Sequence, residues 1–395
     1  MALKEIVKKT LSYCGINIGQ LAALVQSYKN KAVICNVNHT ECEKNCLMLY
    51  VTAPFQTKHI SQAHQNQWQA VEMARIIGTY GYNVDVADYS NADLKFDKQY
   101  DMVIGLIPRG IDVYSSYCKP DCIKVAYLTS MNLAVTSGNE EKRLAELEER
   151  RGVKLQPRVF AGYIQPEIEN FTAAWYFGND YNFHSYDCFK MPPSFRVINS
   201  GYSFDWFNPE LERNPKNFLF IASRGQVHKG LDLLLEIFAE EVPDCHLYIC
   251  SSFKNEEDFC NEYDKELFHT PNIHAIGFVD ISSAEFRKIA ESCAYTILPS
   301  CAEGHVGSIL TAMSAGLIPI VSRECAYEDD EAINLPDCSK TTLSSYIKEY
   351  SQKDKQWLRK ESIKAVDTVK TKFSQACFSE SIVRAMEGTL RAKEV

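Results

Sequence analysis

The sequence lacks several features, and each absence narrows the kind of protein that it can encode. No apolar run reaches the roughly 18 residues of a membrane-spanning helix, so we expect none in this chain of 395 residues. The first residues lack the charged and then apolar order of a signal peptide, which predicts a cytoplasmic protein. The net charge of −9 gives no excess of cations, so nucleic acid is not expected as the main partner.

Tightly paired metal ligands are also scarce. The 15 cysteines are odd in number and scattered, as reduced thiols in the cytoplasm would be. Cys35, His39, Cys42 and Cys46 have a loosely metal-like spacing, but zinc sites usually combine two closer pairs. We therefore favour unrelated thiols over a zinc site, and we expect neither a metal nor a bound cofactor.

Residues 1–30 have the pattern of a helix with one partly apolar face and several lysines near its start. Such a helix could touch a membrane surface, which would place the protein peripherally at the inner membrane face. Packing against its own domain is the simpler interpretation because the basic cluster is small. We assign residues 1–40 to an N-terminal helical extension.

Further along, short apolar runs alternate with helical patterns. A helix is expected at about 65–80, and a charged helical stretch over 139–151 is expected to be a solvated face. The expected strands of the first series are 46–51, 83–89, 102–106, 125–128, 174–178 and 196–198. Those of the second series are 218–221, 246–250, 273–276, 295–298 and 318–321. Such alternation predicts parallel sheets with helices on both faces.

The predicted fold class is therefore α/β, with two Rossmann-like doubly wound domains that face a cleft. The length suits two domains. In such folds ligands bind beyond the carboxyl ends of the strands, so one cleft would hold a donor and an acceptor. The expected parts are an N-terminal acceptor domain, a linker, a C-terminal nucleotide domain and a final helix that crosses back to the first domain, over residues 41–205, 206–216, 217–374 and 375–395.

The first stretch that suggests chemistry is residues 223–230, SRGQVHKG. It follows an expected strand and leads into a helix, where backbone N–H groups and the helix dipole favour an anion. Arg224 and Lys229, five positions apart, could neutralise a diphosphate without a metal. Taken alone, such a pair is more often two surface cations in a loop.

The second stretch is residues 299–316, PSCAEGHVGSILTAMSAG, again between a strand and a helix. Gly304 and Gly307 leave backbone N–H groups open to close approach by phosphate. Glu303 can accept hydrogen bonds from sugar hydroxyls, or it can satisfy the helix dipole. Two cations in one stretch and a carboxylate in the other suit a nucleotide diphosphate that carries a sugar.

Together the two stretches resemble the nucleotide-sugar half of family 4 glycosyltransferases, of group 1 type, which have the two-domain GT-B fold. The family has Arg and Lys five apart and then Gly, here Arg224, Lys229 and Gly230. Its later motif begins with P-S-x-x-E-G. The matching positions of that motif are Pro299, Ser300, Glu303, Gly304, Leu310, Ala312, Met313, Gly316 and Pro319.

The resemblance implies a retaining, metal-independent enzyme of hexosyltransferase type. It would move a sugar from a UDP- or GDP-linked donor to a glycan or a lipid-linked acceptor. Arg224, Lys229 and Glu303 are expected to carry the reaction. The expected substrate-binding residues are Gly304, His305, Val306, Gly307, Ser308, Thr311, Phe278 and His64.

Two departures from the family pattern leave alternatives open. The family's second Glu, which would hold the ribose, is replaced by Thr311. Where many relatives carry a His, residues 129–132 read Thr-Ser-Met-Asn, so no catalytic base is assigned. His59 is an alternative to His64 as a substrate contact.

Two other functions stay open. A weakly active or inactive GT-B subunit that binds sugar nucleotides or glycans is the main alternative function, and a sugar-nucleotide epimerase is a weaker one. The oligomeric state stays open.

Overall fold

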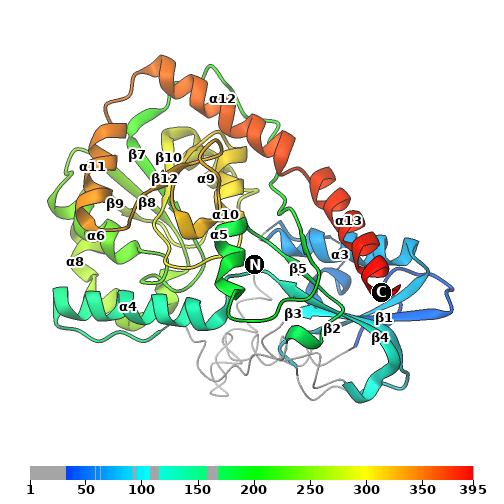
Figure 1. Ribbon diagram of the computed structural model, residues 1–395. Coiled ribbons are helices and arrows are strands. Elements are labelled where there is room, and N and C mark those ends of the chain that lie inside the picture. Colours follow the sequence, from blue (N-terminus) through cyan, green and yellow to red (C-terminus); the bar gives the residue numbers. More distant parts are fainter. Residues whose placement is uncertain are drawn as a thin grey trace, which may run out of the picture.

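The computed structural model describes residues 33–57, 59–62, 64–91, 95–106, 115–157 and 168–394. The helix expected over residues 1–30 lies outside this part of the chain and stays a prediction. The described residues form two α/β domains, each built on a parallel sheet of six strands (Figure 1). The predicted fold class is therefore confirmed.

The sheet of the first domain has the order β2-β1-β3-β4-β5-β6. Its strands are β1 (Lys44–Tyr50), β2 (Tyr82–Asp88), β3 (Tyr100–Leu106), β4 (Cys118–Leu128), β5 (Ala173–Tyr176) and β6 (Ser194–Arg196). Helices α3 (Asn66–Thr79) and α13 (Gln375–Glu394) pack against one face. The last five residues of β1 are all buried, as expected for a parallel strand covered on both faces.

The sheet of the second domain has the order β12-β11-β10-β7-β8-β9. Its strands are β7 (Asn214–Ile221), β8 (His246–Cys250), β9 (Ile273–Ala275), β10 (Cys293–Leu298), β11 (Ile318–Ser322) and β12 (Ile333–Leu335). The edge strand β12 was not expected, because three residues carry too little pattern to mark a strand.

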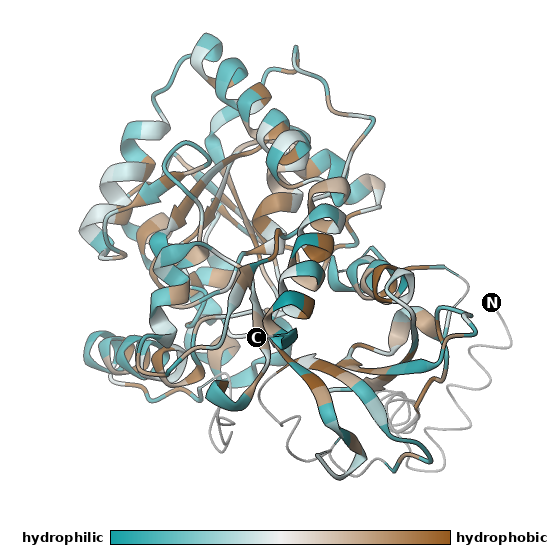
Figure 2. Cartoon of the chain, turned by 45° about the vertical axis from the view of Figure 1, so that its right-hand side comes forward, coloured by the Kyte–Doolittle hydropathy of each residue, from teal (hydrophilic) through white to brown (hydrophobic). Residues whose placement is uncertain are grey.

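The remaining helices lie mainly around the second sheet. They are α4 (Leu133–Arg151), α5 (Asp180–Phe183), α6 (Leu231–Glu240), α7 (Glu257–Glu262), α8 (Asp264–His269), α9 (Ala284–Ser292), α10 (Gly307–Ser314), α11 (Lys340–Tyr350) and α12 (Lys355–Lys372). Figure 2 shows hydrophobic residues concentrated along the strands and hydrophilic residues on the outer sides of the helices. None of the described helices is both long and apolar enough to cross a membrane.

Helix α4 follows a strand of the first sheet but lies along the second domain (Figure 1). Leu147 is fully buried in the core of that domain. Arg150 binds Asp232 of α6 at 2.7 Å, and Arg151 binds Glu266 of α8 at 2.9 Å. The prediction that residues 139–151 form a solvated face is therefore correct for one side of α4 only. Glu141, Lys142, Glu148 and Glu149 are exposed, whereas Arg150 and Arg151 are paired with the neighbouring domain.

The C-terminal helices also connect the domains. Helix α12 packs on α10 of the second domain, and α13 packs on α3 of the first. The rings of Trp68 and Phe378 lie 5.7 Å apart, and the indole N–H of Trp175 donates to the Thr389 hydroxyl at 2.9 Å. Two separate segments, α4 and α13, thus connect the domains on either side of the cleft.

Candidate functional site

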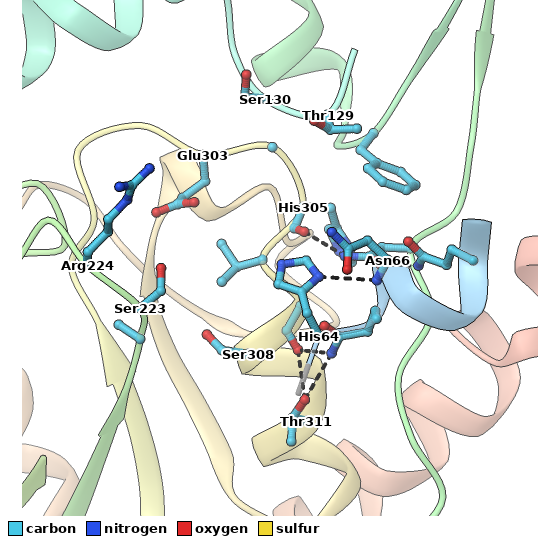
Figure 3. A pocket seen from close by; sticks show the side chains of 18 of the residues that line it. His64, Asn66, Thr129, Ser130, Ser223, Arg224, Glu303, His305, Ser308 and Thr311 are labelled. Carbon is cyan, nitrogen blue, oxygen red and sulfur yellow. Dashed lines mark hydrogen bonds between the residues drawn. The ribbon is translucent and has the colours of Figure 1, made fainter. Parts of the chain in front are cut away.

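A cavity of about 550 Å³ lies between the domains, at the carboxyl ends of strands from both sheets (Figure 3). Its position is the one that doubly wound folds use for ligands. Every residue predicted for the site lines this one cavity: Arg224, Lys229, Glu303, Gly304, His305, Val306, Gly307, Ser308, Thr311, Phe278 and His64. The structure therefore brings the predicted residues together, although it does not assign their roles.

The two predicted cations have different environments. Arg224 is exposed, and no other described residue forms a hydrogen bond or an ion pair with it. Lys229 is 6% exposed, and its ammonium pairs with the Glu303 carboxylate. Gly230 follows with a φ of +76°, and a Cβ there would lie 2.5 Å from the Pro299 carbonyl oxygen. This position therefore requires glycine, which lets the Lys229 loop lie against the Glu303 loop.

One expectation about the first stretch is wrong. Its backbone N–H groups were expected to be open to an anion, but a carboxylate of the protein already accepts from them. The N–H groups of Gly225 and Gln226 donate to the two oxygens of Glu256, at 2.5 and 3.0 Å. The N–H group of Lys229 donates to the Gly225 carbonyl at 2.9 Å. This stretch therefore offers the Arg224 side chain to a ligand, whereas the N–H groups of Gly225, Gln226 and Lys229 are occupied.

The second stretch keeps its N–H groups open. No described residue accepts a hydrogen bond from the N–H groups of His305, Val306, Gly307 or Ser308, and the helix α10 that they begin has no side-chain cap. Open N–H groups at the start of a helix carry a partial positive charge, which attracts an anion. The cavity thus combines these groups with Arg224 on the facing loop.

Glu303 is held from several sides. The Ser300 hydroxyl donates to its Oε1 at 2.5 Å, and Lys229 pairs with the same oxygen. Its backbone carbonyl accepts from the Met131 N–H at 2.9 Å and from the Asn182 side-chain amide at 2.8 Å. Since Met131 and Asn182 belong to the first domain, that domain fixes the loop that carries the carboxylate.

Thr311 is occupied by the first domain as well. Its hydroxyl accepts from the Gln65 side-chain amide at 2.9 Å and donates to the Gly307 carbonyl at 3.1 Å. The same Gln65 amide also donates to the Gly307 carbonyl at 2.6 Å. Figure 3 shows these bonds at the base of the cavity, near His64. At this position, therefore, a threonine binds the facing domain.

Three histidines line the cavity, namely His64, His228 and His305, and the pKa values of His64 and His305 are lowered. His64 accepts from the N–H group of Asn66 at its Nδ1 atom, 3.1 Å away, so its proton lies on Nε2. This side chain is exposed to the solvent of the cavity, but the surrounding protein of the two domains displaces part of its water, and this desolvation, with the nearby Lys229, lowers its pKa. His59, the alternative contact, is exposed and is not among the lining residues.

In His305, the ring is packed between aromatic side chains, whereas the backbone carbonyl oxygen accepts a hydrogen bond. The ring packs between Tyr327 and Phe373, with centroids 4.5 and 4.7 Å away. Neither ring nitrogen has a hydrogen-bond partner among the described residues. Burial, with Arg196 nearby, lowers the pKa of His305 to about 3. Its carbonyl oxygen accepts from the Asn199 side chain at 2.7 Å.

Phe278 lies at the other end of the site and is 68% exposed. It is the most exposed of the large hydrophobic side chains in the described part of the chain. A flat ring that stands free at the edge of a cavity can stack on a nucleobase.

No candidate metal site is seen in the described part of the chain. The described residues contain no group of three or more His, Cys, Asp or Glu side chains that could hold an ion.

Sequence reasoning missed the first-domain residues that fix the second stretch, namely Gln65, Asn182 and Asn199. Single polar residues between apolar runs carry no local pattern. The sequence contained one indication of close contacts here, namely Gly304 and Gly307, where a larger side chain would not fit. A Cβ on Gly307 would lie 2.4 Å from the Gln65 side-chain oxygen, and a Cβ on Gly304 would lie 2.2 Å from the Thr129 carbonyl oxygen.

Part of the sequence matches a known protein family. Residues 215–344 match the family model described as Glycosyl transferases group 1. This glycosyltransferase match covers β7 to the start of α11, and so it includes both stretches described above. No curated protein matches the sequence.

Solved glycosyltransferase-type structures share the fold. Sucrose-phosphate synthase from Thermosynechococcus elongatus has a TM-score of 0.61 at 12% identity, over 89% of this chain and 100% of that chain. HepE of Anabaena, in complex with UDP-glucose, has a TM-score of 0.57 at 11% identity, over 87% and 100%. TarM has a TM-score of 0.52 at 13% identity over 74% of this chain, which spans only 55% of the length of TarM. The chain therefore has the GT-B fold.

Proposed function

We propose that this protein is a glycosyltransferase that moves a sugar from a nucleotide diphosphate donor to a hydroxyl acceptor, with retention and without a metal. One observation carries the proposal: a cation that pairs with no other described residue, open helix N–H groups and a carboxylate line one cavity. Arg224 and the start of α10 supply the first two, and Glu303 supplies the third. The group 1 match over the same residues supports it.

The donor would bind with its diphosphate between Arg224 and the N-terminus of α10. Charged hydrogen bonds from guanidinium and helix N–H groups can neutralise a diphosphate. Glu303, oriented by Lys229 and Ser300, would accept hydrogen bonds from the sugar hydroxyls. Phe278 would lie against the base. As the sugar leaves, the cations would stabilise the charge that develops on the diphosphate.

The facing wall offers no obvious general base. His64 is the only histidine among the described first-domain residues that line the cavity, and none of these residues is Asp or Glu. Its low pKa makes it a weak base and leaves its Nε2–H as a donor. We infer that the acceptor proton passes to an oxygen of the leaving diphosphate, which is consistent with transfer on one face of the sugar and thus with retention.

The donor and acceptor classes are proposed from the neighbours. HepE was solved with UDP-glucose, which favours a UDP-linked donor over a GDP-linked one. WaaG, which shares the fold with a TM-score of 0.55 at 13% identity, is a glycosyltransferase involved in lipopolysaccharide biosynthesis, which favours a glycan or lipid-linked acceptor. We propose that the protein works in the cytoplasm, at the inner membrane face when the acceptor is lipid-linked.

Nucleotide release tests this function directly. The purified chain is incubated with UDP- and GDP-linked hexoses, with and without EDTA, and the anomeric configuration of the product is read by NMR. We expect release of UDP, no loss of rate with EDTA, and the donor's configuration in the product. Absence of both nucleotide binding and release would refute the proposal, and binding without release would favour a GT-B subunit that binds sugar nucleotides without turnover.

A further inference from the structure

The first domain presents an aromatic wall to the cavity at the carboxyl ends of four adjacent strands. Tyr50 ends β1, Leu106 ends β3, Tyr127 is the last residue but one of β4, and Phe177 follows β5. The ring centroids of Tyr50 and Tyr127 are 5.4 Å apart with planes at 79°, and those of Tyr127 and Phe177 are 5.6 Å apart. We call Tyr50, Leu106, Tyr127 and Phe177 the aromatic wall.

The hydroxyl groups of this wall have no hydrogen-bond partner among the described residues. The Tyr127 side chain is 1% exposed, and no described group forms a hydrogen bond with its hydroxyl. Tyr50 lies beside it and is 4% exposed, and no described residue forms a hydrogen bond with its hydroxyl. A buried hydroxyl without a partner is unusual and destabilising. By contrast, the Tyr186 hydroxyl in the same cavity donates to the Ser130 carbonyl at 3.1 Å.

The wall also carries no charge. Burial raises the pKa of both Tyr50 and Tyr127, so these phenols keep their protons. None of the described first-domain residues that line the cavity is Asp, Glu, Lys or Arg. The charged lining residues, Arg224, Lys229 and Glu303, all come from the second domain. A charged group placed against the wall would therefore lose water without gaining an opposite charge.

We propose that the aromatic wall is the acceptor subsite and that it takes an uncharged sugar ring, an assignment that rests on the proposed function. The C–H face of a sugar ring packs on aromatic rings, and its hydroxyls match the unpartnered groups of Tyr50 and Tyr127. A phosphate or a carboxylate on the bound ring is disfavoured, since none of the described first-domain residues that line the cavity is a cation. An aliphatic ligand would leave the two hydroxyls unsatisfied.

The transfer step then balances within the cavity. The bond between the anomeric carbon and the diphosphate oxygen breaks, and the diphosphate leaves with the electron pair. The acceptor oxygen forms the new bond to the anomeric carbon, and its proton goes to the leaving diphosphate. The wall takes no part in this proton transfer. It positions the acceptor hydroxyl opposite the donor that the second domain holds.

The test compares neutral and charged sugars in the presence of saturating UDP. Binding of methyl glucoside, galactoside and mannoside, and of the three corresponding 6-phosphates, is measured by calorimetry or by saturation-transfer NMR. We expect at least one neutral glycoside to bind and its 6-phosphate to bind at least tenfold more weakly. Tyr127→Phe should weaken the neutral sugar about threefold to tenfold, which is the effect of one hydrogen bond.

Folding does not confound this variant, because Tyr127→Phe removes an oxygen that has no partner. Its thermal stability should equal or exceed that of the wild type. The matched control is Tyr295→Phe, whose hydroxyl lies outside the cavity and donates to the Tyr350 carbonyl at 2.7 Å. That variant should lose stability and keep its sugar affinity.

The outcomes separate this inference from the proposed function. Equal or tighter binding of the 6-phosphates, tighter binding of an aliphatic alcohol, an unchanged affinity in Tyr127→Phe, or no sugar binding by UDP-bound protein each overturns the acceptor assignment. In all four cases UDP still binds, so the donor site stands. A protein that binds no nucleotide instead counts against the proposed function.

Discussion

The side-chain amide of Gln65 donates a hydrogen bond of 2.9 Å to the hydroxyl of Thr311. This bond joins the start of α3 in the first domain to α10 in the second. Thr311 occupies the position where the resembling family has a second Glu for the ribose. In this chain the position connects the two domains, so we expect recognition of the proposed donor to depend more on the diphosphate and on the sugar.

Loss of the Thr311 hydroxyl should therefore weaken the interface between the domains. Thr311→Val keeps the shape but leaves one Gln65 N–H without its partner, at a cost of about 1–2 kcal/mol. The measurement is the free energy of unfolding by urea. Thr371→Val is the matched control, since the Thr371 hydroxyl makes the same kind of bond to the carbonyl four residues earlier, at 2.7 Å on the exposed side of α12. A larger loss in the control would contradict this account.

Glu303→Gln should separate nucleotide binding from sugar recognition. The carboxylate lies beside the proposed diphosphate and is paired with Lys229. Its neutralisation removes a repulsion and releases the ammonium, so UDP should bind as well as before or several-fold more tightly. Turnover of the UDP-linked sugar should fall about tenfold or more, because a charged hydrogen bond is lost. Calorimetry and nucleotide release measure the two effects, and parallel losses in both would contradict the assignment.

Burial of His305 predicts a loss of stability in acid. Its pKa is lowered to about 3 in the folded protein, against about 6.5 in an unfolded chain. Between these values the unfolded chain binds more protons, so stability falls as the pH falls, by up to about 1.4 kcal/mol per pH unit. His305→Phe should fit between Tyr327 and Phe373 and reduce this slope. Unfolding curves from pH 7 to pH 4 test it, with the exposed His269→Gln as the control, and parallel curves for His305→Phe and wild type would exclude this role.

The ion pairs of α4 should be needed for stability. Arg150→Met leaves Asp232, which is fully buried, without its nearest cation. Burial already raises the pKa of Asp232 to about 6, against the lowering effect of Arg143 and Arg150. We expect a loss of roughly 2–3 kcal/mol, near the low end for buried pairs because Arg150 is partly exposed. Arg287→Met breaks an exposed pair with Glu291 and should cost about 0.5 kcal/mol or less; equal losses in urea unfolding would count against the prediction.

The sequence was most informative where local pattern decides the structure. Apolar runs bounded by polar residues located eleven of the twelve strands, because a strand buried on both faces has a continuous apolar sequence. The Arg224 and Glu303 stretches could be placed in one cleft because both follow strands of one parallel sheet. The short edge strand β12 lacked such a pattern.

What sequence reasoning missed depends on contacts between distant segments. Glu256 closes the N–H groups of a loop 30 residues earlier, and α4 leaves its own sheet for the other domain. Gln65 and Thr311 are 246 positions apart. Such contacts depend on how the domains meet, which no local periodicity records. The Arg224 side chain, by contrast, is exposed and lines the cavity, and no other described residue pairs with it.

The affinity for UDP with and without the Arg224 side chain tests the central claim most directly. Arg224 is exposed and unpaired within the described chain, so Arg224→Ala leaves the fold intact. Calorimetry should show at least about a tenfold loss of affinity, as expected for a charged hydrogen bond to phosphate, and no loss in Arg384→Ala, an exposed control on α13. An Arg224→Ala protein that binds UDP as tightly as the wild type would contradict the diphosphate site.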